Sequence, residues 1–140
     1  IYLVGSYLSN IEIARLIERL GMKIIGDNLP ESGRLISTGE IDIEGNIYNN
    51  ISQSLIEKRL SPSQNNFHEI LRYDLEEIKR KKVNGVIMIV QKYCEPYEFL
   101  YSIYKKMLDT ERIPLLKLTV LNSEDMKKIK LQLEAFTEMI

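Results

Sequence analysis

Short apolar runs alternate along the chain with stretches in which apolar residues recur every three or four positions. The apolar runs predict strands over residues 1–4, 22–26, 85–90 and 115–121. The third run is apolar throughout, as expected of a strand that is covered on both faces. The periodic stretches between the runs predict amphipathic helices. This alternation of strands and helices favours four parallel strands joined by right-handed crossovers.

Local signals place the ends of several predicted helices. Ser9 and, three residues later, Glu12 form a capping box that starts the first helix, and Gly21 ends it. Pro96 suits the first turn of a later helix, because its missing N–H group has no partner to lose there. Ser123 is expected to cap the last helix.

The middle of the chain is its least regular part. Residues 27–45 are rich in Gly, Asp, Asn and Ser and predict a long loop, of a length that is usually functional or mobile in compact domains. Apolar residues then recur every four positions over 47–60, which predicts a helix. Another helix is predicted from Phe67, with the basic run Lys79–Lys82 at its end. We interpret this run as a solvated helix end that complements the helix dipole.

These elements predict a flavodoxin-like, three-layer α/β domain over residues 1–140, with a four-stranded parallel sheet in the order 2-1-3-4 and helices on both faces. Ligands bind such sheets beyond the carboxyl ends of the strands, near the switch point in strand order. We therefore expect the functional site where the segments 5–8, 27–34, 91–96 and 121–123 meet. Because the chain opens directly on a core strand, we expect it to be one domain of a longer protein.

Composition narrows the classes of function. Of the 140 residues, 44% are hydrophobic and 28% charged, an ordinary globular balance, and the net charge is −1. No overall field attracts nucleic acid or an anionic membrane surface, so we expect neither as a partner. The apolar runs fall well short of the ~20 residues that a membrane span needs. A single cysteine cannot form an internal disulfide, which favours a reducing, cytoplasmic setting.

That cysteine, Cys94, lies between a buried strand and a helix start. A helix N-terminus favours the thiolate, which is the nucleophile and the metal ligand. The alternative, favoured by position alone, is a thiol that packs as a small hydrophobic group. The chain has no Cys and His set at metal-ligand spacing. The one histidine, His68, is expected on the flank of a helix, with a surface or capping role.

The segment that follows the second predicted strand lacks a phosphate-loop pattern. Its Arg34 could bind a phosphate or a carboxylate through two hydrogen bonds, although a solvated surface position is the commoner fate. We expect this segment and the Cys94 loop to border one crevice. The residues expected to line it, beside Cys94, are Asp27, Ser32, Gly33, Arg34, Glu95 and Tyr97.

Two segments together resemble a signature of the 2-hydroxyacyl-CoA dehydratase family, which includes 2-hydroxyglutaryl-CoA dehydratase and benzoyl-CoA reductase subunits. The family reads Asp-Gly-Val-Ile and then Lys-Phe-Cys-Asp-Pro-Tyr-Glu. This chain has Asn-Gly-Val-Ile over 84–87 and Lys-Tyr-Cys-Glu-Pro-Tyr-Glu over 92–98. The segments 21–34, 114–118 and 132–136 are also similar. The resemblance covers nearly the whole chain, as the C-terminal domain of a subunit more than twice as long.

The resemblance implies a definite chemistry. Family subunits hold a [4Fe–4S] cluster between two flavodoxin-like domains with three cysteines, an activator ATPase supplies one electron, and a ketyl radical of the CoA thioester loses water. Cys94 stands at one ligand position, but Pro30 stands at the second and cannot bind iron. The third ligand belongs to the missing N-terminal domain. The family's Pro-Cys-Pro segment is also altered, to Ser61-Pro62-Ser63.

Three interpretations follow. In the first, the chain belongs to a cluster-poor subunit that is the structural partner of a paralogous dehydratase subunit. In the second, it is part of a divergent lyase that binds a [4Fe–4S] cluster mostly through ligands from elsewhere, and the domain alone binds no cofactor. In the third, it is a cluster-free binding or scaffold domain that retains the fold alone. The first ranks slightly above the second, and the third ranks last.

Overall fold

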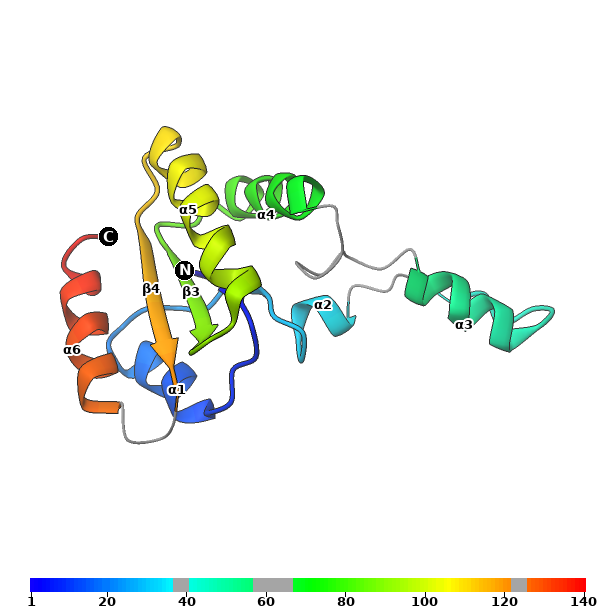
Figure 1. Cartoon of the computed structure of the whole chain (residues 1–140), viewed down its shortest axis with the longest axis horizontal. Helices are drawn as coiled ribbons and strands as arrows, with labels where there is room; N and C mark the ends of the chain where they lie inside the picture. Colours follow the sequence, from blue (N-terminus) through cyan, green and yellow to red (C-terminus); the bar gives the residue numbers. More distant parts are fainter. Residues whose placement is uncertain (37–40, 57–66, 122–125) are drawn as a thin grey trace.

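The computed structural model describes residues 1–36, 41–56, 67–121 and 126–140. Strands and helices alternate along it as the sequence predicts (Figure 1). In chain order they are β1 Tyr2–Gly5, α1 Ile11–Arg19, β2 Gly26–Asn28, α2 Gly33–Ile36, α3 Ile47–Ile56, α4 Phe67–Arg80, β3 Val86–Gln91, α5 Glu95–Thr110, β4 Leu115–Val120 and α6 Met126–Thr137.

The four strands form one parallel sheet in the order β2-β1-β3-β4, which confirms the predicted topology. Central β3 pairs with β1 on one side and β4 on the other; Ile87, for example, lies opposite both Leu3 and Leu116. Each residue from Val86 to Val90 is fully buried. The uninterrupted apolar run in the sequence therefore marks the central strand.

Helices cover both faces of the sheet (Figure 1). Their buried side chains make two separate cores. On one face, α1 and α6 pack on the sheet through side chains such as Ile17 and Leu133. On the other, α4 and α5 pack through side chains such as Ile78 and Leu108. Alternate residues of β3 serve the two cores, since successive strand side chains point to opposite faces. The three-layer α/β architecture is thus confirmed.

Two local predictions are wrong. The second strand does not occupy residues 22–26 but Gly26–Asn28, so Asp27 lies within a strand rather than at the start of a loop. The first helix is capped by Asn10, whose Oδ1 accepts a hydrogen bond from the Glu12 backbone N–H at 3.0 Å. The Ser9 hydroxyl instead accepts a hydrogen bond from the Gln91 amide. Asn is as good a cap as Ser, so cap preference alone does not favour position 9 over position 10.

Other predictions concern the loop and helix ends. The expected long loop contains the short helix α2, and α3 begins at Ile47 as predicted. Pro96 lies in the first turn of α5, as expected. Three predicted features lie outside the described residues: the helix end at 57–60, the segment Ser61–Ser63 and the proposed cap Ser123. In the described part of the chain, no helix is long and apolar enough to cross a membrane.

Helices α4 and α5 end in the same way. Lys82 (φ 52°) and Arg112 (φ 58°) adopt left-handed backbone conformations just beyond these helices. The N–H of the residue after each donates to a carbonyl five residues back, at 3.1 Å for Val83 and 2.9 Å for Ile113. This is the Schellman pattern, which satisfies the last carbonyls of a helix and is usually built on glycine.

Candidate functional site

The carboxyl ends of β1 and β3 lie against each other and are hydrogen-bonded, and they form the base of the predicted site. Gly5 has φ +132°, and a Cβ at this position would lie 2.0 Å from the Ile89 carbonyl oxygen, so no other residue fits. The approach lets the Ser6 N–H donate to the same carbonyl at 2.8 Å. The Ser6 hydroxyl in turn accepts a hydrogen bond from the Gln91 N–H at 2.8 Å. The start of the Cys94 loop is thereby anchored to the end of β1.

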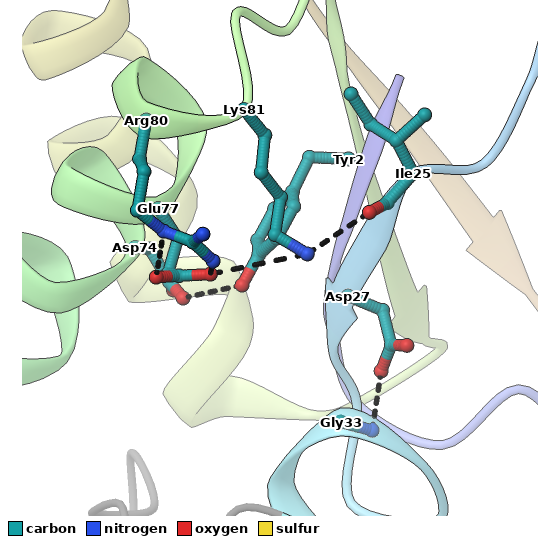
Figure 2. Close-up of polar contacts among 8 residues, drawn as sticks. All are labelled: Tyr2, Ile25, Asp27, Gly33, Asp74, Glu77, Arg80 and Lys81. Atoms are coloured by element: carbon teal, nitrogen blue, oxygen red, sulfur yellow. Dashed lines mark hydrogen bonds and ion pairs between the residues drawn. The ribbon is translucent and has the colours of Figure 1, made fainter.

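The turn after β2 is organised by Asp27. Its Oδ1 accepts hydrogen bonds from the Leu29 N–H at 3.0 Å, the Ser32 hydroxyl at 2.5 Å and the Gly33 N–H at 2.7 Å (Figure 2 shows the last of these). A Cβ on Gly33 would lie 2.1 Å from the Asp27 carbonyl oxygen, so the turn requires glycine. These three crevice candidates thus hold the start of α2 in place.

Arg34, the first residue after this turn, points into the protein. Its side chain is 8% exposed, so a solvated surface position is the wrong expectation for it. The guanidinium donates to both Asn28 oxygens, at 3.3 Å to Oδ1 and 2.9 Å to the carbonyl. It also donates to the Tyr97 hydroxyl at 3.2 Å, which joins α2 to the first turn of α5.

A second buried charge lies beyond Asn28. Asp74 of α4 is 0% exposed, and its Oδ1 accepts a hydrogen bond from Asn28 Nδ2 at 2.8 Å. The Tyr2 hydroxyl also donates to Oδ1, at 3.4 Å (Figure 2), and the Tyr104 hydroxyl donates to Oδ2. The Asn28 amide therefore connects a buried cation, Arg34, to a buried anion. Buried charged groups are tolerated when they are hydrogen-bonded, as both are here.

Both tyrosines of α5 in this network have perturbed pKa values. Burial raises the pKa of the Tyr97 hydroxyl, and the neighbouring Arg34 cation partly opposes that change. Burial and the Asp74 carboxylate raise the pKa of Tyr104 well above its ordinary value. Both hydroxyls consequently remain protonated at neutral pH.

The turn from β3 into α5 presents Cys94. This residue is the N-cap of α5, and its carbonyl accepts hydrogen bonds from the N–H groups of Tyr97 and Glu98, each at 3.1 Å. The side chain is half-buried and packs against the core beneath α4 and α5. Before it, Tyr93 has φ 70°, although it does not follow the C-terminal end of a helix as Lys82 and Arg112 do. Such a conformation costs about 1 kcal/mol or more and tends to occur at functional sites.

The structure brings some of the predicted site residues together. Because Arg34 contacts Tyr97 within one turn of Cys94, the turn after β2 and the turn after β3 border the same edge of the sheet. Glu95 is exposed at the start of α5, and Pro30 is exposed in the turn after β2. His68 is exposed near the start of α4, with its ring 4.3 Å from that of Phe67. It lies on a helix flank, as predicted.

Sequence reasoning missed Asn28 and Asp74. One signal for Asp74 was available, because it falls in the inward-facing row of α4 between Leu71 and Ile78, where a charged residue is unexpected. Asn28 carried no comparable signal, since asparagine at a strand end is ordinary turn chemistry.

The site can supply few metal ligands. In the described ranges, no group of three or more His, Cys, Asp or Glu side chains is placed to hold a metal ion. The whole chain contains one cysteine, and the expected second ligand position is Pro30. Since an iron–sulfur cluster needs several thiolate or comparable ligands, these residues do not fit such a cluster by themselves.

A doubly wound α/β domain with its polar network at the carboxyl edge of the sheet is a common class of ligand-binding domain. Within that class, the chain belongs to the family described as "2-hydroxyglutaryl-CoA dehydratase, D-component", whose model matches residues 1–140. The resemblance seen in the sequence is thus confirmed. A curated relative, the (R)-phenyllactyl-CoA dehydratase beta subunit of Clostridium sporogenes, is 22% identical over 131 residues. The alignment covers 92% of this chain and 34% of that relative, so the chain spans about a third of its length.

Proposed function

We propose that this chain belongs to the structural partner subunit of a 2-hydroxyacyl-CoA dehydratase and does not itself provide the ligand set of an iron–sulfur cluster. The family match over residues 1–140 supports the dehydratase assignment. The observation that carries the partner role is the ligand count, because the site holds one thiol, Cys94, and a proline at position 30.

In this proposal the paralogous subunit holds the cluster and an activator ATPase supplies the electron. The complex then removes water from a 2-hydroxyacyl-CoA thioester in the cytoplasm. This chain contributes a rigid surface that faces the partner subunit. The Asp27 turn and the Arg34–Tyr97 contact fix the edge of the sheet that faces the partner, and the half-buried Cys94 lies on that edge.

A second candidate is a subunit that binds a cluster through Cys94 and ligands from elsewhere in the protein. The position of Cys94 at the start of α5, with its side chain only half-buried, favours it. Among the described residues, no side-chain hydrogen bond caps this helix, so the Cys94 thiol does not act as a helix cap.

Iron content separates the two candidates. The intact protein is purified without oxygen, alone and together with its paralogous subunit, as wild type and as Cys94→Ser. We expect the complex to contain iron and to dehydrate a 2-hydroxyacyl-CoA, and Cys94→Ser to leave the iron content unchanged. Loss of iron from Cys94→Ser would favour the second candidate. Failure to form any complex with the paralogue would refute the partner role.

A further inference from the structure

Tyr97 and Tyr104 both belong to the buried network on α5, but they use their hydroxyl groups differently. The Tyr104 hydroxyl donates to Asp74 Oδ2, so its proton has an acceptor inside the protein. The Tyr97 hydroxyl oxygen accepts a hydrogen bond from Arg34 Nη2 at 3.2 Å. Among the residues that the structure describes, no group accepts the proton of Tyr97. Tyr97 therefore has a hydrogen bond left to donate.

The burial of Tyr97 makes this unused donor unusual. Tyr97 is 8% exposed, so little solvent surrounds it. The hydroxyl group of a buried tyrosine usually finds a hydrogen-bond partner for its proton, as that of Tyr104 does at 2% exposed. A nearly buried donor without an acceptor costs free energy and calls for an explanation. The simplest one is an acceptor that comes from outside this domain.

Tyr97 lies where a ligand is expected. It is in the first turn of α5, which follows β3 at the carboxyl edge of the sheet, and Cys94 is the N-cap of the same helix. Ligands of doubly wound domains bind at this edge. Arg34, the residue that the sequence suggested as a ligand-binding group, is instead held by Asn28 and donates to Tyr97. The donor that this network offers to a ligand is therefore the phenol of Tyr97.

The charges around Tyr97 indicate an uncharged acceptor. Burial raises the pKa of Tyr97, so the hydroxyl keeps its proton at neutral pH and acts as a donor. The positive charge of Arg34 is offset by Asp74 across the Asn28 amide, and the exposed carboxylate of Glu95 lies in the same turn of α5. These groups offer no net positive charge to a phosphate or a carboxylate. A neutral carbonyl oxygen suits the site better.

We infer that the Tyr97 hydroxyl donates a hydrogen bond to the thioester carbonyl oxygen of a 2-hydroxyacyl-CoA. This inference rests on the proposed function, which supplies the substrate class, and it adds the residue of this chain that contacts the substrate. A thioester carbonyl is a neutral acceptor on a slender chain, so it can reach a donor that is recessed among side chains. A backbone carbonyl of the paralogous subunit is also neutral, but the folded surface around it reaches a recessed donor less easily.

The test compares two ligands that differ only at the carbonyl group. The complex of the intact protein with its paralogous subunit is titrated with a 2-hydroxyacyl-CoA thioester and with the thioether analogue in which CH₂ replaces C=O. The activator ATPase is left out so that the thioester is not consumed. We expect wild type to bind the thioester about fivefold to tenfold more tightly than the thioether, as one hydrogen bond would give. Tyr97→Phe should reduce this preference to less than about twofold.

Tyr104→Phe is the matched control, because it removes a hydroxyl group from the same buried network and leaves the Tyr97 phenol in place. It should retain the thioester preference of wild type. Three results would overturn the inference: no preference in wild type, a full preference in Tyr97→Phe, or loss of the preference in both variants. Weaker binding of the paralogous subunit by Tyr97→Phe, with the thioester preference intact, would identify a protein carbonyl as the acceptor and would also overturn it.

A second measurement does not depend on the Tyr97→Phe variant folding. A 3-fluorotyrosine placed at position 97 retains the hydroxyl group, and its fluorine NMR signal is expected to shift with the thioester and not with the thioether. Equal shifts with the two ligands would refute the contact. If the wild-type complex binds the thioester without using Tyr97, the inference fails and the proposed function stands. If no complex forms, or the complex binds neither ligand, the proposed function itself fails.

Discussion

Replacing Asn28 with Asp tests the buried hydrogen-bond network by changing one atom, the amide nitrogen Nδ2, to an oxygen. Asn28 Nδ2 donates to Asp74 Oδ1 at 2.8 Å, while Asn28 Oδ1 accepts from the Arg34 Nε–H at 3.3 Å. The substitution hardly changes the size of the side chain, but it turns the donor that faces Asp74 into a second carboxylate oxygen. The contact with Arg34 is retained and becomes a contact between opposite charges.

Two estimates give the size of the effect. Two ionised carboxylates about 4 Å apart repel by about 4 kcal/mol at the effective dielectric of buried sites. Alternatively, the pair binds one proton, which at pH 7 costs about 4 kcal/mol for a group that ordinarily titrates near 3.9. The stronger hydrogen bond from Arg34 offsets about 1–2 kcal/mol of this cost. We therefore expect Asn28→Asp to lower the free energy of unfolding by about 2–3 kcal/mol at pH 7.

The loss should depend on pH. In the folded variant the two carboxylates raise the pKa of the pair above its value in the unfolded chain. Stability is therefore highest at low pH and falls as pH rises above about 4. Between pH 5 and pH 7 the variant should lose up to about 2.7 kcal/mol relative to wild type, at 1.36 kcal/mol for each pH unit.

Urea denaturation of the intact protein at pH 5 and pH 7 measures these quantities. Asn28→Leu is the control, since it removes both side-chain hydrogen bonds of the amide without adding a titratable group. Its loss of stability should be the same at the two pH values. Equal losses for Asn28→Asp at pH 5 and pH 7, or a loss below about 1 kcal/mol at pH 7, would show that Asp74 and Asn28 are not packed as described.

Three further changes have expected outcomes. Gly33→Ala forces a Cβ against the Asp27 carbonyl oxygen, 2.1 Å away, and should lower the free energy of unfolding by at least about 2 kcal/mol. Lys82→Gly and Arg112→Gly relieve left-handed backbone conformations at helix ends, and each should raise the melting temperature through a gain of about 0.5–1 kcal/mol. Because the pKa of Tyr104 is raised in the fold, wild type should lose stability as pH rises above about 10. Tyr104→Phe should lower stability at pH 7 but flatten that alkaline decline, as followed by circular dichroism; an equally steep decline in the variant would contradict the assignment.

The architecture of the domain could be predicted because buried strands and helices have characteristic patterns of apolar residues in the sequence. The apolar run of β3 identified the central strand, and the strand–helix alternation limited the topology to very few parallel arrangements. The boundaries of β2 were not predictable in the same way. Its apolar residues Ile24 and Ile25 precede the paired segment, and the strand itself reads Gly-Asp-Asn, which is turn chemistry when seen without its neighbours.

The candidate site was predictable in position but not in detail. Strand order placed the turns near Arg34 and Cys94 at one edge of the sheet, and the contact with Tyr97 agrees with that placement. The burial of Arg34 could not be inferred, because a buried cation is stable only when specific partners surround it. Those partners, Asn28 and Tyr97, come from other elements and are brought together by the tertiary fold.

The spacing of two tyrosines places a constraint on the length of α5. Tyr97 and Tyr104 lie seven positions apart, about two helical turns, so both project toward the same side, where one meets Arg34 and the other Asp74. Inserting or deleting a single residue between them would rotate one ring by about 100° and break one of the contacts. Relatives that keep both contacts should therefore show no gaps across this stretch, while exposed residues within it, such as Phe99 and Ser102, are free to vary.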